Sequence, residues 1–263
     1  IVVDNGDTIQ GNYNHLFLSD SVNPMILAME DIGYDSYSFG NHEFNFGMDK
    51  LFEITTQSEN ANIAALCANL YKDGTRVFDA YNMETMPNGI KIATIGVVTP
   101  HIDKWDGPNL VGYVPTNPVT EVAKVIEEIK AAGGADVYVV TAHMGFDEEY
   151  GNDSAKEVAE ANPEVDVVIM GHSHDADKVR EAGNALLIQP TNSGGSLGKV
   201  EVTLSDNGTE YTVKSKTHEF LSTKGVEEAS GLATKLDSYH QRALADASTI
   251  IGTLEGEDLA DAN

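Results

Sequence analysis

Four clusters of polar residues carry the side chains in this sequence that could do chemistry. Each cluster directly follows an apolar run of the kind that forms a buried strand, where the ligand sites of open α/β sheets collect. Together the clusters supply a carboxylate, an amide oxygen and three imidazoles, a mixture that suits zinc, manganese or iron, and their glycines let the backbone approach an ion closely. They are Asp4-Asn5-Gly6-Asp7, Gly40-Asn41-His42-Glu43, Thr141-Ala142-His143-Met144-Gly145 and Gly171-His172-Ser173-His174.

Each cluster taken alone has a plainer interpretation. A buried histidine such as His143 is more often a hydrogen-bonded core residue than a metal ligand. Asp7 and Asn41 are residue types that commonly occupy turns, and His172 and His174 could belong to an ordinary loop. The occurrence of all four clusters in this order favours a metal site over these separate explanations.

The elements that must position the clusters alternate between strands and helices. The clearest helix is expected from Pro118 to Ala132, with Asn117 as its cap, one apolar face, and Gly133-Gly134 at its end. The alternation predicts an α/β layered fold, and strands that are apolar throughout indicate burial on both faces of a sheet. Apolar runs predict these strands at residues 1–3, 36–39, 63–66, 91–98, 137–141, 165–170 and 185–188.

The last part of the chain has a different pattern. Alternating apolar residues on either side of Asn207-Gly208 predict an antiparallel hairpin that closes the domain. A polar helical segment at residues 226–247 and an acidic tail follow, which is the pattern of a linker helix leading to another domain. We therefore expect one domain at residues 1–222, and a linker helix at residues 223–263 that begins a C-terminal domain absent from this chain.

Composition narrows the classes of partner. The 263 residues include 42 acidic and 16 basic ones, and the formal net charge of −26 would repel nucleic-acid polymers and anionic membrane surfaces. No apolar run approaches the length of about 20 residues that a membrane-spanning helix needs. Cys67, the single cysteine, is expected to be a buried thiol. The sequence starts inside an apolar run at Ile1, without a signal-peptide pattern, so we expect the natural N-terminus to lie further upstream.

The clusters resemble the motifs of the calcineurin-like metallophosphoesterases, and within that family those of the 5′-nucleotidase and 2′,3′-cyclic-nucleotide 2′-phosphodiesterase group. The resemblance covers almost the whole chain. It implies that Asp7, in the Gly-Asp motif, bridges two metal ions. It implies further that the Gly-Asn-His-Glu motif supplies a ligand, Asn41, and the catalytic histidine, His42. Because the motifs contain no lysine or arginine, stabilisation of the charge on a phosphate would fall to the metal ions and to His42, which could also protonate the leaving oxygen.

The resemblance also assigns the remaining ligands. His143 and His172 would complete the site of the second ion, and His174 would bind the first. The cofactors would be two divalent ions of manganese, zinc, iron or cobalt, because this set of ligands serves all four metals. Two such ions lower the pKa of a bound water and stabilise charge on phosphoryl oxygens. Supporting positions around the site are assigned to Glu43, Asn45 and Asn192.

The choice between the 5′-nucleotidase branch and the cyclic-phosphodiesterase branch of the group rests largely on Asn45. In the 5′-nucleotidase branch an aspartate usually stands there and pairs with the catalytic histidine, whereas Asn45 cannot raise the pKa of His42 as a carboxylate would. Trp105-Asp106 and Asn109-Leu110 also resemble the cyclic-phosphodiesterase branch. We therefore expect hydrolysis of a 2′,3′-cyclic nucleotide and then of the 3′-nucleotide. The alternatives are a 5′-nucleotidase or other phosphomonoesterase, and a non-catalytic metal- or nucleotide-binding surface module.

The fold that the resemblance implies is a two-sheet sandwich flanked by helices, with a dinuclear metal site at the strand ends. It also implies a small nucleotide as substrate and an extracytoplasmic location in a periplasm, in a cell wall or outside the cell. The family's first motif, an Asp-x-His before the Gly-Asp motif, does not occur in this sequence. We therefore expect this chain to hold firmly only the ion that binds Asp7, Asn41, His143 and His172, and to hydrolyse its substrate only feebly or not at all, since a lone ion cannot stabilise both the attacking and the leaving oxygens.

Overall fold

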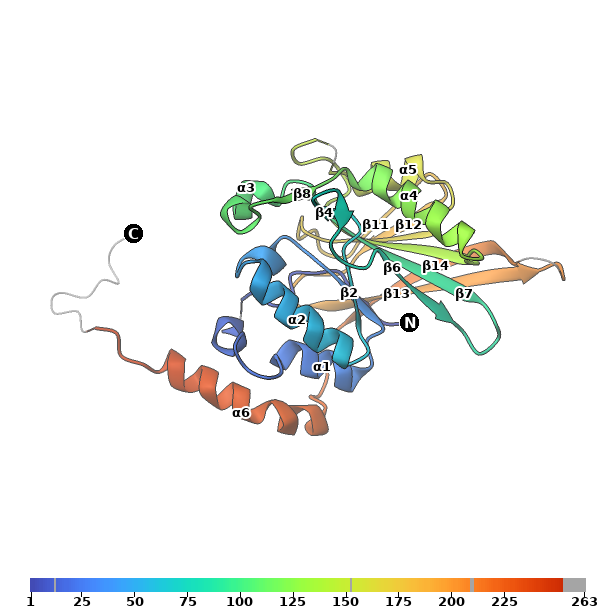
Figure 1. Cartoon of the computed structure of the whole chain (residues 1–263). Coiled ribbons are helices and arrows are strands. Elements are labelled where there is room, and N and C mark those ends of the chain that lie inside the picture. The colour runs from blue at the N-terminus through green and yellow to red at the C-terminus, as the bar shows by residue number, and fades with distance from the viewer. Residues whose placement is uncertain (12, 152, 209–210, 253–263) are drawn as a thin grey trace, which may run out of the picture. The chain divides into compact units, whose positions relative to one another are not determined.

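The computed structural model describes residues 1–11, 13–151, 153–208 and 211–252 (Figure 1). The chain divides into two compact units, Ile1–Glu227 and Glu228–Asn263. In the second unit, helix α6 (Ser230–Ala247) occupies most of the helical segment predicted at residues 226–247. The acidic tail after residue 252 lies outside the described residues. Within the described part of the chain, no helix has the length and apolar character needed to cross a membrane.

Three parallel strands form one of the two sheets that carry the polar clusters. β1 (Val3–Asp4), β2 (Ser36–Ser38) and β3 (Ala64–Leu66) pair in that order. Parallel neighbours need a crossover connection. Helix α1 (Pro24–Ile32) makes the connection between β1 and β2, and α2 (Met48–Asn60) makes the next one. The parallel pairing brings the polar residues after β1 and β2 to the same edge of the sheet.

A mixed sheet of six strands carries the other two clusters, in the order β11, β12, β10, β9, β7, β6. Its four inner strands run parallel, and the two edge strands β11 and β6 pair antiparallel with their neighbours. The fold is therefore α/β with mixed sheets flanked by helices. The strand bounds are Tyr81–Thr85 for β6, Lys91–Val98 for β7, Val137–His143 for β9, Val167–Met170 for β10, Lys178–Ala182 for β11 and Ala185–Gln189 for β12.

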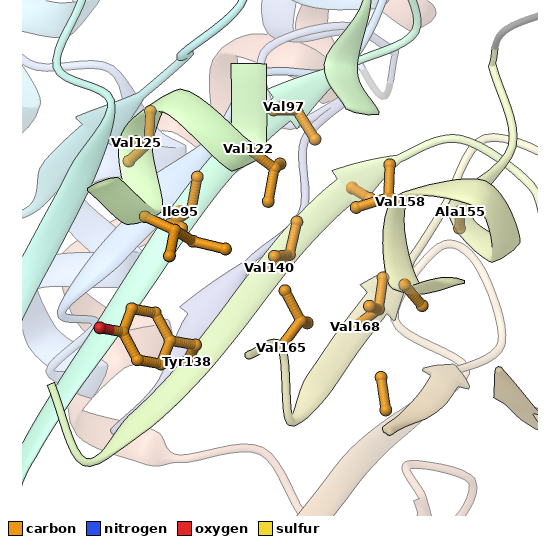
Figure 2. Close-up of a cluster of buried hydrophobic side chains, with 14 of the residues drawn as sticks. Ile95, Val97, Val122, Val125, Tyr138, Val140, Ala155, Val158, Val165 and Val168 are labelled. Atoms are coloured by element: carbon orange, nitrogen blue, oxygen red, sulfur yellow. The ribbon is translucent and has the colours of Figure 1, made fainter. Parts of the chain in front are cut away.

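Helices α4 (Pro118–Ala131) and α5 (Ala155–Ala161) cover one face of the six-stranded sheet. Figure 2 shows Val140 of β9 in the core between Val122 of α4 and Val158 of α5. All three side chains are buried. Burying one such side chain contributes about 1.5–3 kcal/mol, so this contact fixes the helices on the sheet that carries His143.

Helix α4 confirms the helix predicted at residues 118–132. The Asn117 side chain accepts hydrogen bonds from the backbone N–H groups of Val119 (2.9 Å) and Thr120 (3.3 Å), as an N-cap does. Gly133 and Gly134 follow the last turn with φ angles of 113° and 74°, a conformation that ends a helix.

The predicted hairpin is confirmed by β13 (Ser196–Asp206) and β14 (Tyr211–Ser222), which pair antiparallel. Apolar residues of both strands pack against Val139 and Val167 on the face of the six-stranded sheet opposite α4. Residues 209 and 210, between the two strands in sequence, lie outside the described residues. The hairpin thus covers part of the second face of the sheet, in agreement with the burial on both faces that the continuous apolar strands predicted.

The predicted strands differ from the observed ones by no more than two residues at either end. The edge strands β6 and β11 have no counterpart in the prediction. Both are half-polar sequences without a continuous apolar run, because an antiparallel edge strand buries less of its surface than a central parallel one. Also unpredicted are the short elements β4 (Leu70–Lys72), β5 (Thr75–Arg76), β8 (Tyr113–Pro115), α3 (Asp103–Asp106), η1 (Asn14–Phe17), η2 (His42–Phe44) and η3 (Gly107–Asn109).

The two sheets meet at small side chains. Ser38 of β2 and Thr141 of β9 are buried and share a hydrogen bond between their hydroxyl groups. A Cβ atom on Gly96 of β7 would lie 2.5 Å from the Cβ of Leu66 and 2.6 Å from the Oγ of Ser38. The close approach of β2 and β9 brings the loops that follow them into contact, and these loops carry the polar clusters.

Candidate active site

The four polar clusters lie at the carboxyl ends of four strands. Asp4 to Asp7 end and follow β1, Gly40 to Glu43 follow β2, His143 ends β9, and Gly171 to His174 follow β10. β1 and β2 belong to the three-stranded sheet, and β9 and β10 to the six-stranded one. The candidate site is therefore assembled from both sheets, at the edge where parallel α/β sheets bind ligands.

Two glycines allow the β1 and β2 loops to touch. Gly6 has a φ angle of 92°, and a Cβ on it would overlap the backbone nitrogen of Gly40. A Cβ on Gly40 would overlap the Asp7 carboxylate and lie 2.7 Å from the Cε1 of His143. Neither position has room for a side chain, so glycine at both places lets Asp7 and His143 come together.

Glu43 joins the same two loops through its carboxylate. The side chain is fully buried and accepts hydrogen bonds from the backbone N–H groups of Asp7 (2.7 Å), Thr8 (2.6 Å), Ile9 (3.3 Å) and Gly40 (2.6 Å). Burial and the neighbouring Asp7 carboxylate raise the pKa of Glu43 to about 7, against the effect of the N–H donors. Glu43 therefore fixes the backbone of the two loops that carry Asp7 and Asn41.

Asp7 receives two contacts at its two oxygens. Its Oδ1 accepts a hydrogen bond from the backbone N–H of His42 (2.9 Å), and its Oδ2 lies 3.2 Å from the Nε2 of His143. Burial alone would raise the pKa of Asp7, but the contacts with His143 and His42 outweigh it and lower the pKa to about 2. Asp7 is thus a carboxylate near neutral pH, which a metal ligand must be.

His143 is oriented by a backbone carbonyl. Its Nδ1 lies 2.5 Å from the carbonyl oxygen of Asn5, which can only accept, so Nδ1 is the protonated nitrogen. The Asn5 amide in turn donates to the carbonyls of Ala142 (3.2 Å) and Ile169 (3.0 Å), which ties the β1 loop to β9 and β10. The sequence assigned no role to Asn5, although it lies in the first polar cluster.

The other nitrogen of His143 fits a cation. Nε2 is buried and has no hydrogen-bond partner of good geometry, although the Asp7 carboxylate is near. Burial lowers the pKa of His143, but Asp7 more than compensates and raises it, because the carboxylate favours positive charge at this position. A histidine that donates Nδ1–H to a carbonyl and presents its free Nε2 beside a carboxylate has the arrangement of a metal ligand.

His172 and Asn41 continue the cluster. The Nδ1 of His172 lies 2.9 Å from the Oδ1 of Asn41, and its Nε2 lies 2.9 Å from a carboxylate oxygen of Glu149. Its ring centroid lies 5.5 Å from that of His143. Burial and the neighbouring His143 lower the pKa of His172, which favours the neutral ring that metals bind. The structure thus brings together Asp7, Asn41, His143 and His172.

The two remaining predicted residues lie apart from this group. His174 is exposed on the loop after β10, with a φ angle of 52°. The Asn192 side chain is exposed and donates to the Oγ of Ser193 (3.3 Å), while its carbonyl accepts from the N–H of Gly195 (3.1 Å), as in a turn. In the described part of the chain, no group of three or more His, Cys, Asp or Glu side chains is already arranged to hold a metal ion.

His42, the candidate catalytic residue, directly follows Asn41 in the sequence. Its Nδ1 lies 2.7 Å from the Oδ1 of Asn45, so the two side chains are in direct contact. The amide nitrogen of Asn45 donates to both oxygens of Asp106, at 3.1 Å and 2.9 Å. His42 is therefore held by a short chain of polar side chains.

An open pocket of about 630 Å³ lies over these residues. Trp105 forms part of its wall, 40% exposed, with its ring centroid 5.3 Å from that of His172. None of its lining residues is a lysine or an arginine, so a phosphate bound there would depend on metal ions and histidines for positive charge. The lining residues are Asn41, His42, Trp105, Gly145, Asp147, Glu148, Glu149, His172 and Ser173.

A model of the calcineurin-like phosphoesterase family matches residues 1–176 of this chain. The chain belongs to this family. Calcineurin-like phosphoesterases are hydrolases that typically bind two metal ions, and the donors at Asp7, Asn41, His143 and His172 are of the types that such ions bind.

Sequence relatives show to which group of the family the chain belongs. It is 35% identical over 195 residues to the 2′,3′-cyclic-nucleotide 2′-phosphodiesterase/3′-nucleotidase of Haemophilus influenzae, covering 66% of this chain and 29% of that protein. It is 36% identical over 161 residues to the 5′-nucleotidase of Vibrio vulnificus, covering 58% of this chain and 28% of that protein. This phosphoesterase therefore belongs to the group that contains both kinds of enzyme, and it spans less than a third of the length of either relative.

A solved structure shows the same fold. The calcineurin-like phosphoesterase YfkN of Bacillus subtilis superposes with a TM-score of 0.84 at 24% sequence identity, over 95% of this chain and 85% of that one. The α/β arrangement of mixed sheets flanked by helices is therefore the metallophosphoesterase-like fold.

We predict that Glu43→Gln lowers the stability of this phosphoesterase by about 1–3 kcal/mol, the cost of leaving buried polar groups unsatisfied. Glutamine keeps one acceptor but turns an NH₂ group toward backbone N–H donors that now face a carboxylate oxygen. Glu59→Gln on the exposed surface of α2 is the matched control. Urea unfolding of both variants measures the effect, and equal midpoints for Glu43→Gln and the control would contradict the role assigned to Glu43.

Proposed function

We propose that this chain is the catalytic domain of a metal-dependent 2′,3′-cyclic-nucleotide 2′-phosphodiesterase that also acts as a 3′-nucleotidase. The observation that carries the proposal is the position of His42 in the open pocket, with the amide of Asn45 and not a carboxylate at its Nδ1. The likeness to the Haemophilus influenzae enzyme supports the same branch. The domain would comprise residues 1–222, and residues 223–263 would connect it to a C-terminal domain.

Metal ions would bind between the two sheets of the sandwich. Asp7, Asn41, His143 and His172 would hold one divalent ion, and Asp7 with His174 would contribute to the site of a second. Manganese, zinc, iron and cobalt all suit these donors. When bound, the ions lower the pKa of a water and neutralise charge on the phosphoryl oxygens.

The protein's own residues would position the ester and move one proton. Asn45 accepts from the Nδ1 of His42, so the proton for the leaving oxygen of the ester would be held at Nε2 and transferred from there. The backbone N–H of His42 donates to the Asp7 carboxylate and so fixes the side chain that would bind the ions. Trp105 would supply an apolar wall for the nucleoside, since its exposed ring lines the pocket beside His172.

A 5′-nucleotidase is the second candidate, because the Vibrio vulnificus enzyme is 36% identical over the matched region. The two candidates differ in which ester oxygen leaves, and therefore in how the ribose must lie in the pocket. For either activity we propose an extracytoplasmic site of action, where enzymes of this group release phosphate and nucleosides from nucleotides.

The substrates distinguish these candidates. We predict that kcat/KM in the presence of Mn²⁺ is higher for 2′,3′-cyclic AMP and 3′-AMP than for 5′-AMP, and that EDTA abolishes all three activities. Phosphate release and chromatographic analysis of the products measure the rates. A preference for 5′-AMP would transfer the assignment to the 5′-nucleotidase, and metal binding without any hydrolysis would favour a non-catalytic module.

We predict that His42→Ala lowers kcat by about 10²–10⁴-fold, the usual contribution of a general acid or base, and leaves metal content nearly unchanged. His218→Ala, at an exposed position of β14, is the control. Steady-state kinetics and elemental analysis of the purified variants give the two quantities. Loss of metal together with activity would make His42 a ligand and would contradict its assignment to proton transfer.

A further inference from the structure

Asp106 lies behind the candidate catalytic histidine, separated from it by one side chain. It is the last residue of α3, only 5% exposed, and its two oxygens accept hydrogen bonds from the amide nitrogen of Asn45 at 3.1 Å and 2.9 Å. Asn45 and Asp106 are 61 positions apart in sequence. The chain of contacts therefore runs from a buried carboxylate through an amide to the imidazole of His42.

The carboxylate decides how the amide faces. An ionised carboxylate can only accept hydrogen bonds, so the Asn45 nitrogen must point toward Asp106 and the Asn45 oxygen toward His42. That oxygen is also only an acceptor, so the Nδ1 of His42, 2.7 Å away, must carry the hydrogen. Nε2 is then the nitrogen that exchanges a proton, and His42 lines the pocket.

Asn109 holds Asp106 against the loop that carries His42. Its amide nitrogen lies 2.9 Å from the carbonyl oxygen of Phe44, 3.1 Å from that of Asn45 and 3.3 Å from the Oδ1 of Asp106. The segment from α3 to η3 is thus fastened to η2, the short helix that begins at His42. This gives a physical role to Asp106 and Asn109, which the function proposed above does not employ.

We propose that Asp106 is a positioning residue that acts through Asn45: it fixes the amide and thereby holds His42 in the tautomer with hydrogen on Nδ1. The inference rests on the proposed function only in assigning proton transfer to His42. A carboxylate in direct contact with the Nδ1 of His42 would hold the same tautomer. Here the amide of Asn45 lies between the Asp106 carboxylate and the His42 ring. The amide can present oxygen or nitrogen, so the carboxylate is required to select the oxygen.

The experiment reads the tautomer directly. Nitrogen-15 spectra of the histidine side chains distinguish a protonated Nδ1 from a protonated Nε2, and His42→Ala identifies the His42 resonances by their loss. The spectra are recorded on the 263-residue chain without added metal, at a pH at which the His42 resonances themselves show a ring with a single protonated nitrogen. For the wild-type chain we expect His42 with hydrogen on Nδ1. A wild-type spectrum with hydrogen on Nε2 overturns the proposal without any variant of Asp106.

Three variants test the part played by Asp106. Asp106→Leu keeps much of the volume and removes both acceptors, so Asn45 is free to turn and His42 should shift toward the Nε2–H tautomer. The double variant N45D/D106N exchanges the two groups, so that a carboxylate again accepts from Nδ1 and an amide donates to it, and it should restore the Nδ1–H tautomer. Asp103→Leu, at an exposed position of the same helix, should leave the spectrum unchanged.

Kinetics on the preferred nucleotide provide the second readout. We predict that Asp106→Leu lowers kcat by roughly 10²-fold or more, up to the loss predicted for His42→Ala, with little change in KM. The double variant should recover most of kcat. An unchanged tautomer in a folded Asp106→Leu, or a double variant that stays in the Nε2–H form, refutes the positioning role. If the wild-type chain hydrolyses no nucleotide, the proposed function fails, while the spectra still decide the role of Asp106.

Discussion

The candidate site depends on one buried carboxylate. Glu43 accepts four backbone N–H bonds, three from residues 7–9 after β1 and one from Gly40 after β2. Without it, these N–H groups, three of which lie in buried bonds, would lose their acceptor, at a cost of about 1–3 kcal/mol for each buried group left unsatisfied. The two loops therefore have one favourable arrangement. That arrangement places Asp7 against the ring of His143, which belongs to the other sheet.

The same arrangement concentrates negative charge. Burial raises the pKa of Asp4 and of Glu43, and the nearby Asp7 carboxylate contributes to the increase in both. In the described part of the chain no lysine or arginine forms an ion pair with any of the three; His143 is the positively ionisable group that contacts Asp7. Holding like charges together in a buried site costs free energy unless a cation compensates. A divalent ion between Asp7 and His143 would supply that compensation, and stability and metal binding are then properties of the same contacts.

Much of this could be predicted from the sequence. The central strands, the helix after Asn117 and the hairpin follow from apolar periodicity and capping residues, which are local patterns. The four polar clusters could be recognised because each follows an apolar run, whereas the grouping of Asp7, Asn41, His143 and His172 around one ion was implied by the resemblance to the metallophosphoesterase family. The contact of Asn45 with His42 is also local, since the two residues are three positions apart in one short helical turn.

The parts that could not be predicted depend on contacts between distant segments. Asp106 meets Asn45 across 61 residues and Glu149 meets His172 across 23, and no periodicity encodes either distance. The edge strands β6 and β11 were missed because pairing on one side permits polar residues at most positions. Asn5 was noticed as part of a cluster, but its bonds to the ends of β9 and β10 require knowledge of how the two sheets pack.

The most direct measurement is anomalous X-ray scattering from crystals of this chain grown with manganese or zinc. A single compact peak bonded to Asp7, Asn41, His143 and His172, with the His143 Nε2 facing the ion, is the predicted result. Peaks only at exposed carboxylates, or an ion that leaves Asp7 and His143 in their present contact, would contradict the claim that the two sheets are joined to build a metal site.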